Sequence, residues 1–158
     1  FEKRLAYAQA HLDEPAICDR PPLRLLRLSL SELSAADMKN RRSLDAFIAA
    51  MPDTRISFVR ALAPKSEKHF RLCADEAACA AWALPLEHTA SLPSVRCVRV
   101  IHRFACQPWD DEAVPEILAC AQKAGHAVRV DGELFGLHLA SETSEGKVFL
   151  YAAVYLPI

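Results

Sequence analysis

The sequence AAVYLPI, residues 152–158, ends the chain, and a near copy, AAWALPL, occupies residues 80–86. The two copies are 72 residues apart. The same offset places LRLLRL, residues 23–28, over VRCVRV, residues 95–100, with both arginines aligned. Two agreements at one offset favour an internal duplication, and such repeats are sought early because a missed repeat leads to the wrong fold. The alternative is two unrelated amphipathic stretches that share common residues.

The composition is that of a packed globular protein. Its 158 residues suit one domain, which at this size buries roughly 68–70% of the surface of the unfolded chain. The 19 basic and 20 acidic residues leave a net charge of -1, so there is no basic excess for nucleic acid. No apolar run approaches the roughly 18 residues that cross a bilayer, and the charged start is no signal peptide. We expect a cytoplasmic protein with no membrane partner, and the missing initiator Met before Phe1 suggests a fragment or a processed chain.

The cysteines lack the spacing of a metal site. They are Cys18, Cys73, Cys79, Cys97, Cys106 and Cys120. No C-x-x-C or H-x-x-x-H pair occurs, so we expect reduced, mostly buried thiols, no bound metal and no cofactor. A Cys106 nucleophile assisted by His102 is the alternative, but no third group that would orient the pair stands beside them.

The first half of the chain alternates strand and helix patterns after a short N-terminal helix. Residues 1–14 have a helical apolar pattern that ends at Pro15. LRLLRLSL, RISFVRAL and HFRLCA are predicted as strands. A helix between the first two is predicted to begin near Ser34 and to end before Pro52.

The second half repeats this order. VRCVRVIHRF is predicted as a strand, and residues 110–124 as a helix that ends at Gly125. HAVRVDGELFGLHLA is predicted as a strand interrupted near Gly132, and its VRV lies over ISF, residues 56–58, at the same offset. KVFLYAAVYLPI is predicted as the last strand.

These elements predict an α+β fold. It is a duplicated strand-helix-strand-strand module with a mostly antiparallel sheet, helices on one face and a concave ligand-binding face on the other. Residues 1–20 are predicted as a linker helix and turn. Residues 21–158 are predicted as the ligand-binding domain, with halves of about 21–90 and 91–158.

The last predicted strand has two different faces, because neighbouring side chains of a strand point to opposite sides of a sheet. One face is aliphatic from Val148 to Leu156, and the other carries Phe149, Tyr151 and Tyr155. Helices must bury their own apolar sides, and the aliphatic face suits them. We therefore predict that the aromatic face binds an apolar or aromatic small molecule. The alternative is that these rings complete a core or pair across strands.

Together these features resemble the GyrI-like (gyrase-inhibitor-like) small-molecule-binding domain. The resemblance covers about residues 21–158 and includes the two similar halves, VRVIHRF, the helix end Ala124-Gly125-His126, a strand after Gly132 and the final YLPI. It implies the effector-binding domain of a MerR-type or AraC-type bacterial transcription regulator, and drug binding is known in this family. It also implies that DNA is bound only through a domain outside this chain. A homodimer through the N-terminal helix or an upstream region stays open.

Two acids typical of the family are missing. Its last strand typically contains Glu-Ile-Tyr-Ile-Pro-Ile, and the matching run keeps Tyr155 without the glutamate. Its preceding strand usually presents Glu-x-Tyr, where this chain has Gly136-Leu137-His138, with Glu133 as the nearest acid. A buried organic cation needs a carboxylate or an aromatic cage, so cationic drugs are disfavoured as ligands.

The missing glutamate also bears on catalysis. Family members that resemble hydrolases use a pocket Glu with a Tyr, so we expect a sensor with no catalytic residues. A stand-alone hydrolase or toxin-neutralising binder is the first alternative. A protein-interaction module without a ligand is the second.

Several candidate residues each have a structural alternative. His102 stands where the family has His-x-Gly, and it is predicted either as a core histidine or as a pocket donor. His138 replaces the expected pocket tyrosine and has the same two interpretations. Trp109 lies in a predicted loop that could roof a cleft, but it could equally be a packing residue, as could Trp82. The complete set of candidate ligand-binding residues is Phe58, His102, Trp109, Glu133, His138, Phe149, Tyr151 and Tyr155.

Overall fold

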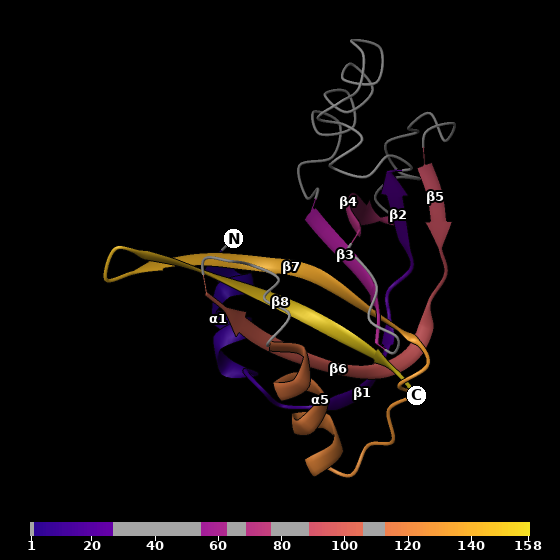
Figure 1. Cartoon of the computed structure of the whole chain (residues 1–158). Helices are drawn as coiled ribbons and strands as arrows, with labels where there is room; N and C mark the ends of the chain where they lie inside the picture. Colours follow the sequence, from indigo (N-terminus) through magenta and orange to yellow (C-terminus); the bar gives the residue numbers. More distant parts are fainter. Residues whose placement is uncertain (1, 27–54, 63–68, 77–88, 106–112) are drawn as a thin grey trace.

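The computed structural model describes residues 2–26, 55–62, 69–76, 89–105 and 113–158. The predicted helix of the first half, the AAWALPL segment and both tryptophans lie outside these residues. Within them the chain forms two helices and one eight-stranded antiparallel sheet, which confirms the α+β class (Figure 1). Neither of these two helices is long and apolar enough to cross a membrane.

The helices are α1 (Glu2–Ala10) and α5 (Ala113–Lys123). The strands are β1 (Ala16–Arg20), β2 (Leu23–Leu26), β3 (Arg55–Ala61), β4 (His69–Asp75), β5 (Thr89–Leu92), β6 (Val95–Phe104), β7 (Glu133–Ser144) and β8 (Lys147–Pro157).

The order of strands in the sheet agrees with the predicted duplication. The sheet runs β1-β6-β8-β7-β3-β4-β2-β5. The second strands of the two halves, β7 and β3, pair at its centre, and in each half the third strand separates the second from the first. The strands that precede each half, β1 and β5, pair with the first strand of the other half. The sheet therefore has the same order from either end.

Only one of the matches at the 72-residue offset joins equivalent strands. Leu23 begins β2 and Val95 begins β6, and both are first strands. Residues 128–130 precede β7, so their alignment with β3 was wrong. The AAVYLPI segment lies at the end of β8, whereas β4, its counterpart strand, ends at Asp75 before AAWALPL begins. Segments of different length in the two halves shift the later matches out of register.

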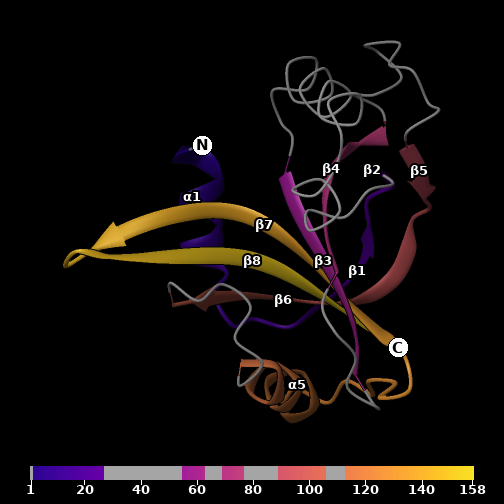
Figure 2. The same ribbon diagram turned by 45° about the horizontal axis from the view of Figure 1, so that its top comes forward.

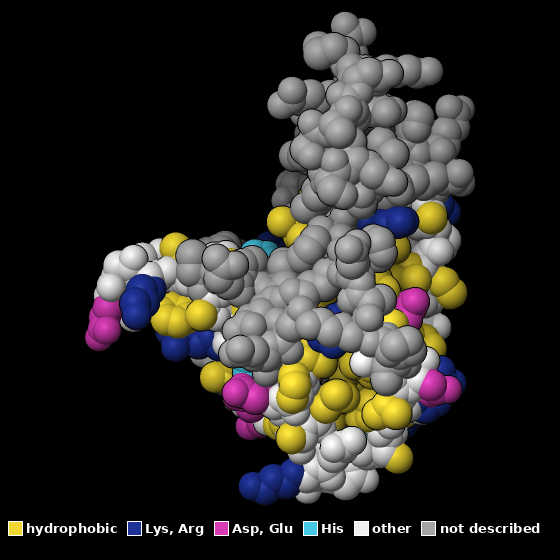
Figure 3. Space-filling view, viewed as in Figure 1, with side chains coloured by type: hydrophobic (Ala, Val, Ile, Leu, Met, Phe, Trp, Pro, Cys, Tyr) yellow, Lys and Arg dark blue, Asp and Glu magenta, His cyan; other side chains and the backbone are white. Residues whose placement is uncertain are grey.

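Helix α5 covers the aliphatic face of the sheet, as predicted. Its buried residues recur at helical spacing and form its apolar side: Ala113, Val114, Ile117 and Ala121. They pack with buried residues of β6 and β8, namely Val98, Val100, Phe104, Ala152, Val154 and Leu156. From this side of the molecule, hydrophobic side chains gather over α5 and around it (Figure 3).

The end of α5 follows the sequence prediction. Gly125 has a positive φ of 89°, a conformation that glycine adopts without steric strain. The backbone N–H of Gly125 donates to the carbonyl of Gln122 over 3.0 Å, and that of His126 donates to Ala121 over 3.1 Å. This pair of hydrogen bonds satisfies carbonyls that the end of a helix leaves free.

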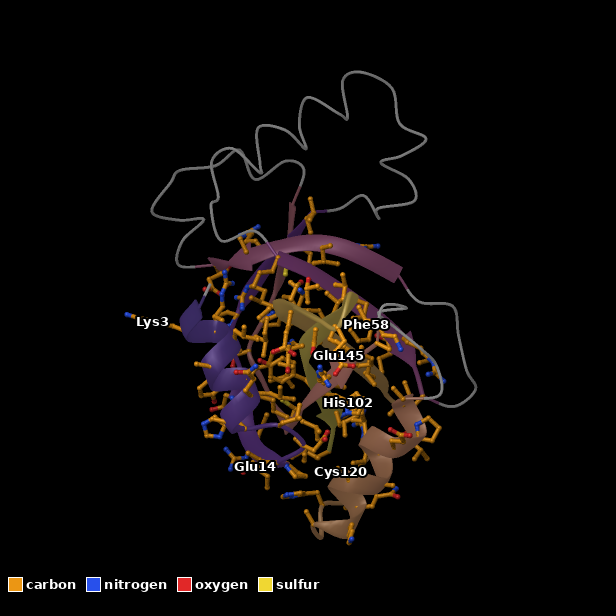
Figure 4. All side chains as sticks on the ribbon, turned by 90° about the vertical axis from the view of Figure 1, so that its left-hand side faces the viewer. Lys3, Glu14, Phe58, His102, Cys120 and Glu145 are labelled. Atoms are coloured by element: carbon orange, nitrogen blue, oxygen red, sulfur yellow. The ribbon has the colours of Figure 1, made fainter. Side chains whose placement is uncertain are left out.

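Helix α1, predicted as part of a linker, packs on the opposite face of the same strands. Figures 2 and 4 show α1 and α5 on opposite sides of β6, β7 and β8. Ala8 is fully buried in a cluster with Tyr151 and Ala153, and Leu5 packs against the same cluster. The apolar side of α1 thus covers part of the face that carries the aromatic residues.

Candidate functional site

Four rings define one face of the sheet, called the aromatic face below. They are Phe135 on β7 and Phe149, Tyr151 and Tyr155 on β8. Alternation along β8 points Tyr151 and Tyr155 away from the α5 side, as predicted. Phe135 is the register partner of Tyr155, and their ring centroids are 6.3 Å apart. The two tyrosines are largely buried, with exposed fractions of 3% and 8%.

The aromatic face is concave near Tyr155. Strands β1 and β7 are separated by β6 and β8, so a flat sheet would hold them about 14 Å apart. The guanidinium carbon of Arg20 on β1 nevertheless lies 5.0 Å from the centroid of the Phe135 ring on β7. Because side chains stand roughly perpendicular to a sheet, this contact indicates that the sheet curves toward this face.

Arg20 is a buried cation without a counter-ion in the described part of the chain. It is 8% exposed, and it takes part in no ion pair with a described carboxylate. Its Nη2 donates to the carbonyl oxygen of Pro93 over 2.8 Å. Burial lowers the pKa of Arg20 from its ordinary value, and the neighbouring Cys97 and Tyr155 partly offset this.

The hydroxyl of Tyr155 is similarly unengaged. Among the described residues it makes no hydrogen bond. Burial raises the pKa of Tyr155 to about 12, helped by Cys18 and opposed by the positive charge of Arg99. A buried phenol usually finds a hydrogen-bond partner, so this group is available to a ligand.

Further arginines lie on this face. Arg99 on β6 is the register partner of Tyr155, and its guanidinium carbon lies 5.5 Å from the centroid of the Tyr7 ring on α1. Arg55 on β3 pairs with Asp75 over 3.0 Å. Within the described residues Arg99, like Arg20, has no ion-pair partner. We call the group formed by Arg20, Arg99, Phe135 and Tyr155 the Arg20 cluster.

The Tyr151 end of the same face has a hydrogen-bond network centred on Glu142. The Tyr151 hydroxyl and Arg103 Nη2 both lie 3.1 Å from Glu142 Oε1 and donate to it. Gln9 of α1 donates to Glu142 Oε2 over 2.7 Å. The Arg103 guanidinium also lies 3.7 Å from the centroid of the Phe149 ring. This end is tied to α1, and its phenol and charges are paired, although Arg103 Nε is buried and has no described acceptor.

Two of the predicted site residues lie on the other face. Phe58 belongs to the core beneath α5, and its ring covers Gly136 so closely that a Cβ added there would overlap it. His102 is the register partner of Ala152, a residue of the α5 side. Its Nδ1 lies 2.9 Å from Asp13 Oδ1. Figure 4 labels both residues, and both belong to the side of the sheet that α5 covers.

Three predicted residues remain. Glu133 is exposed at the start of β7. His138 is half-buried, with Nε2 3.0 Å from Ser141 Oγ, and burial is the main cause that lowers its pKa below the usual value. Trp109 lies outside the described residues. Sequence reasoning thus found the tyrosines of the face but missed Arg20, Arg99 and Phe135.

The sequence contained a signal for Arg99, in the alternation of its strand, but none for Arg20. Arg99 and Arg103 alternate along β6 with the same period as the rings on β8, so both strands point a polar or aromatic residue to one face. Arg20 gave no such signal, because its position depends on how the sheet curves.

The comparisons with known proteins are as follows. No protein-family model and no curated protein sequence matches this chain. Among solved structures, the EcmrR C-terminal domain matches at a TM-score of 0.52 and 10% identity, covering 91% of this chain and 96% of that one. EcmrR in an EcmrR–DNA complex matches at a TM-score of 0.49 and 10% identity, and the match covers 98% of this chain and 63% of that one. SAV2435 bound to tetraphenylphosphonium matches at a TM-score of 0.46 and 12% identity, and the match covers 90% of this chain and 93% of that one.

At 10% identity, the likeness to the EcmrR C-terminal domain concerns the fold alone. It extends over nearly the whole of both chains. The shared fold supports the GyrI-like domain that the sequence resembles.

Proposed function

We propose that this chain is the ligand-sensing domain of a bacterial transcription regulator and binds an aromatic or apolar small molecule at the Tyr155 end of its aromatic face. The observation that carries the proposal is the Arg20 cluster: aromatic rings, a phenol and two cations that have no ion-pair or hydroxyl partner among the described residues, gathered on the concave side of the sheet. Ligand sites combine apolar and aromatic walls with a few polar groups that orient the ligand. The fold, shared with the EcmrR C-terminal domain, is in keeping with this role.

The regulatory part of the proposal requires a DNA-binding domain outside this sequence. The ligand would favour one arrangement of that domain over another, because a ligand shifts an equilibrium only by its difference in affinity for the two states. We propose a sensor and not an enzyme. The nearest acid in sequence that could replace the missing family glutamate, Glu133, is exposed at the start of its strand.

The test uses the neutral fluorescent probe N-phenyl-1-naphthylamine, titrated into the 158-residue chain. We expect saturable binding with a rise in emission, because the probe enters an apolar site. Tyr155→Leu removes the ring and the phenol and should weaken binding by several-fold to about tenfold. The matched control is Phe149→Leu, an aromatic-to-leucine change at the other end of the same face, which should leave the affinity within about twofold.

Binding that is absent, or equal in wild type and Tyr155→Leu, would contradict the proposal. Weaker binding in Phe149→Leu than in Tyr155→Leu would move the site to the wrong end of the face. Either outcome would favour an interaction module whose rings serve only the core.

A further inference from the structure

We propose that the ligand is an anion: an aromatic molecule with a carboxylate or sulfonate group that binds Arg20, with Arg99 as the second cation. This inference rests on the proposed function and names the chemistry of the ligand. The acids typical of the family would favour a cationic ligand, and this chain lacks them, so the proposed ligand has the opposite charge.

The burial of Arg20 is the first observation. Taking a guanidinium out of water without a counter-ion is unfavourable, and buried charges are therefore normally paired. Arg20 is 8% exposed and forms no ion pair with a carboxylate of the described residues. An anionic group of a ligand would supply the missing partner.

The hydrogen-bond donors of Arg20 are the second observation. Nη2 is engaged by the carbonyl of Pro93, but Nε is buried and donates to no described acceptor. Arg99 has a buried Nε in the same condition. Guanidinium groups match carboxylates and sulfonates well, since their planar donors can bind two oxygens at once.

The acids around this face are the third observation, because none of those described neutralises the cluster. Asp75 is paired with Arg55, and Glu142 accepts from Arg103 at the other end of the face. Asp19 follows Cys18 on β1, points to the opposite side of the sheet, and lies 3.8 Å from Arg96. Glu133 is exposed. The Arg20 cluster keeps its positive charge.

The Tyr155 hydroxyl and the neighbouring Cys97 thiol cannot supply the counter-charge either. Burial raises the pKa of the Cys97 thiol to about 11, and that of Tyr155 stands at about 12. Both groups are therefore protonated near pH 7. The Tyr155 hydroxyl is then a further donor for an anionic oxygen.

The rings determine the rest of the ligand. The guanidinium of Arg20 stacks on Phe135, which in turn lies beside Tyr155. An aromatic body would pack against these rings while its acidic group reaches Arg20. An aromatic cation at the same place would face Arg20 and Arg99, which no described carboxylate neutralises, and is disfavoured by charge repulsion.

The test compares two pairs of probes of similar ring structure and different charge. 8-Anilino-1-naphthalenesulfonate has the ring skeleton of N-phenyl-1-naphthylamine with an added sulfonate. Tetraphenylborate and tetraphenylphosphonium have nearly the same shape and opposite charges. We expect the wild-type chain to bind each anion at least about tenfold more tightly than its neutral or cationic counterpart.

Arg20→Gln then tests the residue. It should weaken anilinonaphthalenesulfonate binding about 10- to 100-fold and change binding of the neutral probe by less than about twofold. The matched control is Arg96→Gln on β6, whose side chain is 68% exposed and points to the other side of the sheet. It should change neither affinity. Arg20→Lys, which keeps the charge but loses the planar fork, should fall between wild type and Arg20→Gln.

The outcomes separate the two proposals. If the neutral probe binds but the anions bind no better, and Arg20→Gln acts on both probes alike, the anion inference is overturned and the proposed function stands. If no probe binds, the proposed function fails with it. If Arg20→Gln does not fold, as judged by its thermal unfolding, the wild-type preference between tetraphenylborate and tetraphenylphosphonium decides the matter.

Discussion

The two ends of the aromatic face carry the same residue on the same strand, and they differ in how their polar groups are satisfied. At one end, the Tyr151 hydroxyl and Arg103 donate to Glu142, and Gln9 ties this carboxylate to α1. At the other end, Arg20 and Tyr155 meet no described carboxylate. The two tyrosines are only four residues apart in β8.

A stripe of aromatic residues therefore does not by itself define a binding site. Both tyrosines are nearly as buried as a core residue, so exposure does not distinguish them. What distinguishes them is whether the hydroxyl and the charge beside each ring have partners among the described residues. A buried polar group without a partner lowers the stability of the fold, and a ligand that supplies the partner can restore it. The Tyr151 end is therefore structural, and the Tyr155 end is the one we assign to the ligand.

The largest expected effect comes from removing the centre of the Tyr151 network. Glu142→Leu leaves the Tyr151 hydroxyl, Arg103 and the Gln9 amide without their acceptor. We expect the free energy of unfolding to fall by about 2–3 kcal/mol, less than for a fully buried pair because Glu142 and Arg103 are 23% and 35% exposed. Urea unfolding at pH 7 measures this difference.

Glu133→Leu is the matched control for Glu142→Leu, since both acids stand on β7 and Glu133 is exposed. It should change the free energy of unfolding by no more than about 0.5 kcal/mol. A loss from Glu142→Leu as small as this would contradict the structural role of the Tyr151 end.

A smaller effect compares the two hydroxyls directly. Tyr151→Phe removes the hydroxyl that donates a 3.1 Å hydrogen bond to Glu142, and we expect the free energy of unfolding to fall by about 1 kcal/mol. Tyr155→Phe removes a hydroxyl that makes no hydrogen bond with a described residue, so the ligand-free protein should lose less than about 0.5 kcal/mol. Equal losses in urea unfolding would mean that the two ends are alike and that Tyr155 is also structural.

Six of the eight described strands and the end of α5 could be predicted from the sequence because their signals are local. The exceptions are β1, whose residues were predicted as part of a linker and turn, and β5, where no strand was predicted. The alternation of KVFLYAAVYLPI separates Tyr151 from Val154 without any knowledge of the neighbouring strands. Gly125 likewise ends α5 through its own backbone conformation. Such features depend on a few adjacent residues, and the structure confirms them.

The candidate site depends on contacts between distant segments, and this is where the sequence was insufficient. Arg20 and Phe135 are far apart in the chain and three positions apart in the sheet, so only the curvature brings them together. Gly136 was matched to a family acid, but it faces Phe58 on the α5 side, where a longer side chain would not fit. Trp109 stays a prediction.

The smallest expected effect concerns the point on β7 where the two ends of the face meet. The register between β7 and β8 shifts between His138 and Ala140. Before the shift Leu137 pairs with Ala153, toward the Tyr155 end of the face, and after it Ala140 pairs with Tyr151. His138 is half-buried there. Burial, and then the charge of Arg4, lower its pKa below the usual 6.5, and the backbone of Ala140 partly opposes them.

This lowered pKa makes stability depend on pH. As the pH falls below about 6.5 the unfolded chain binds a proton at His138 that the folded chain does not, so the folded state loses stability. The loss is absent above the unfolded pKa. His138→Gln removes this contribution, and its unfolding free energy should fall less than that of wild type between about pH 7 and pH 5.

His11→Gln is the matched control, because the His11 side chain is 44% exposed on the surface beside Glu14. Its pH profile in urea unfolding should follow that of wild type more closely than the profile of His138→Gln does. If His138→Gln leaves the profile unchanged, the histidine is solvated and the boundary between the two ends is open to water.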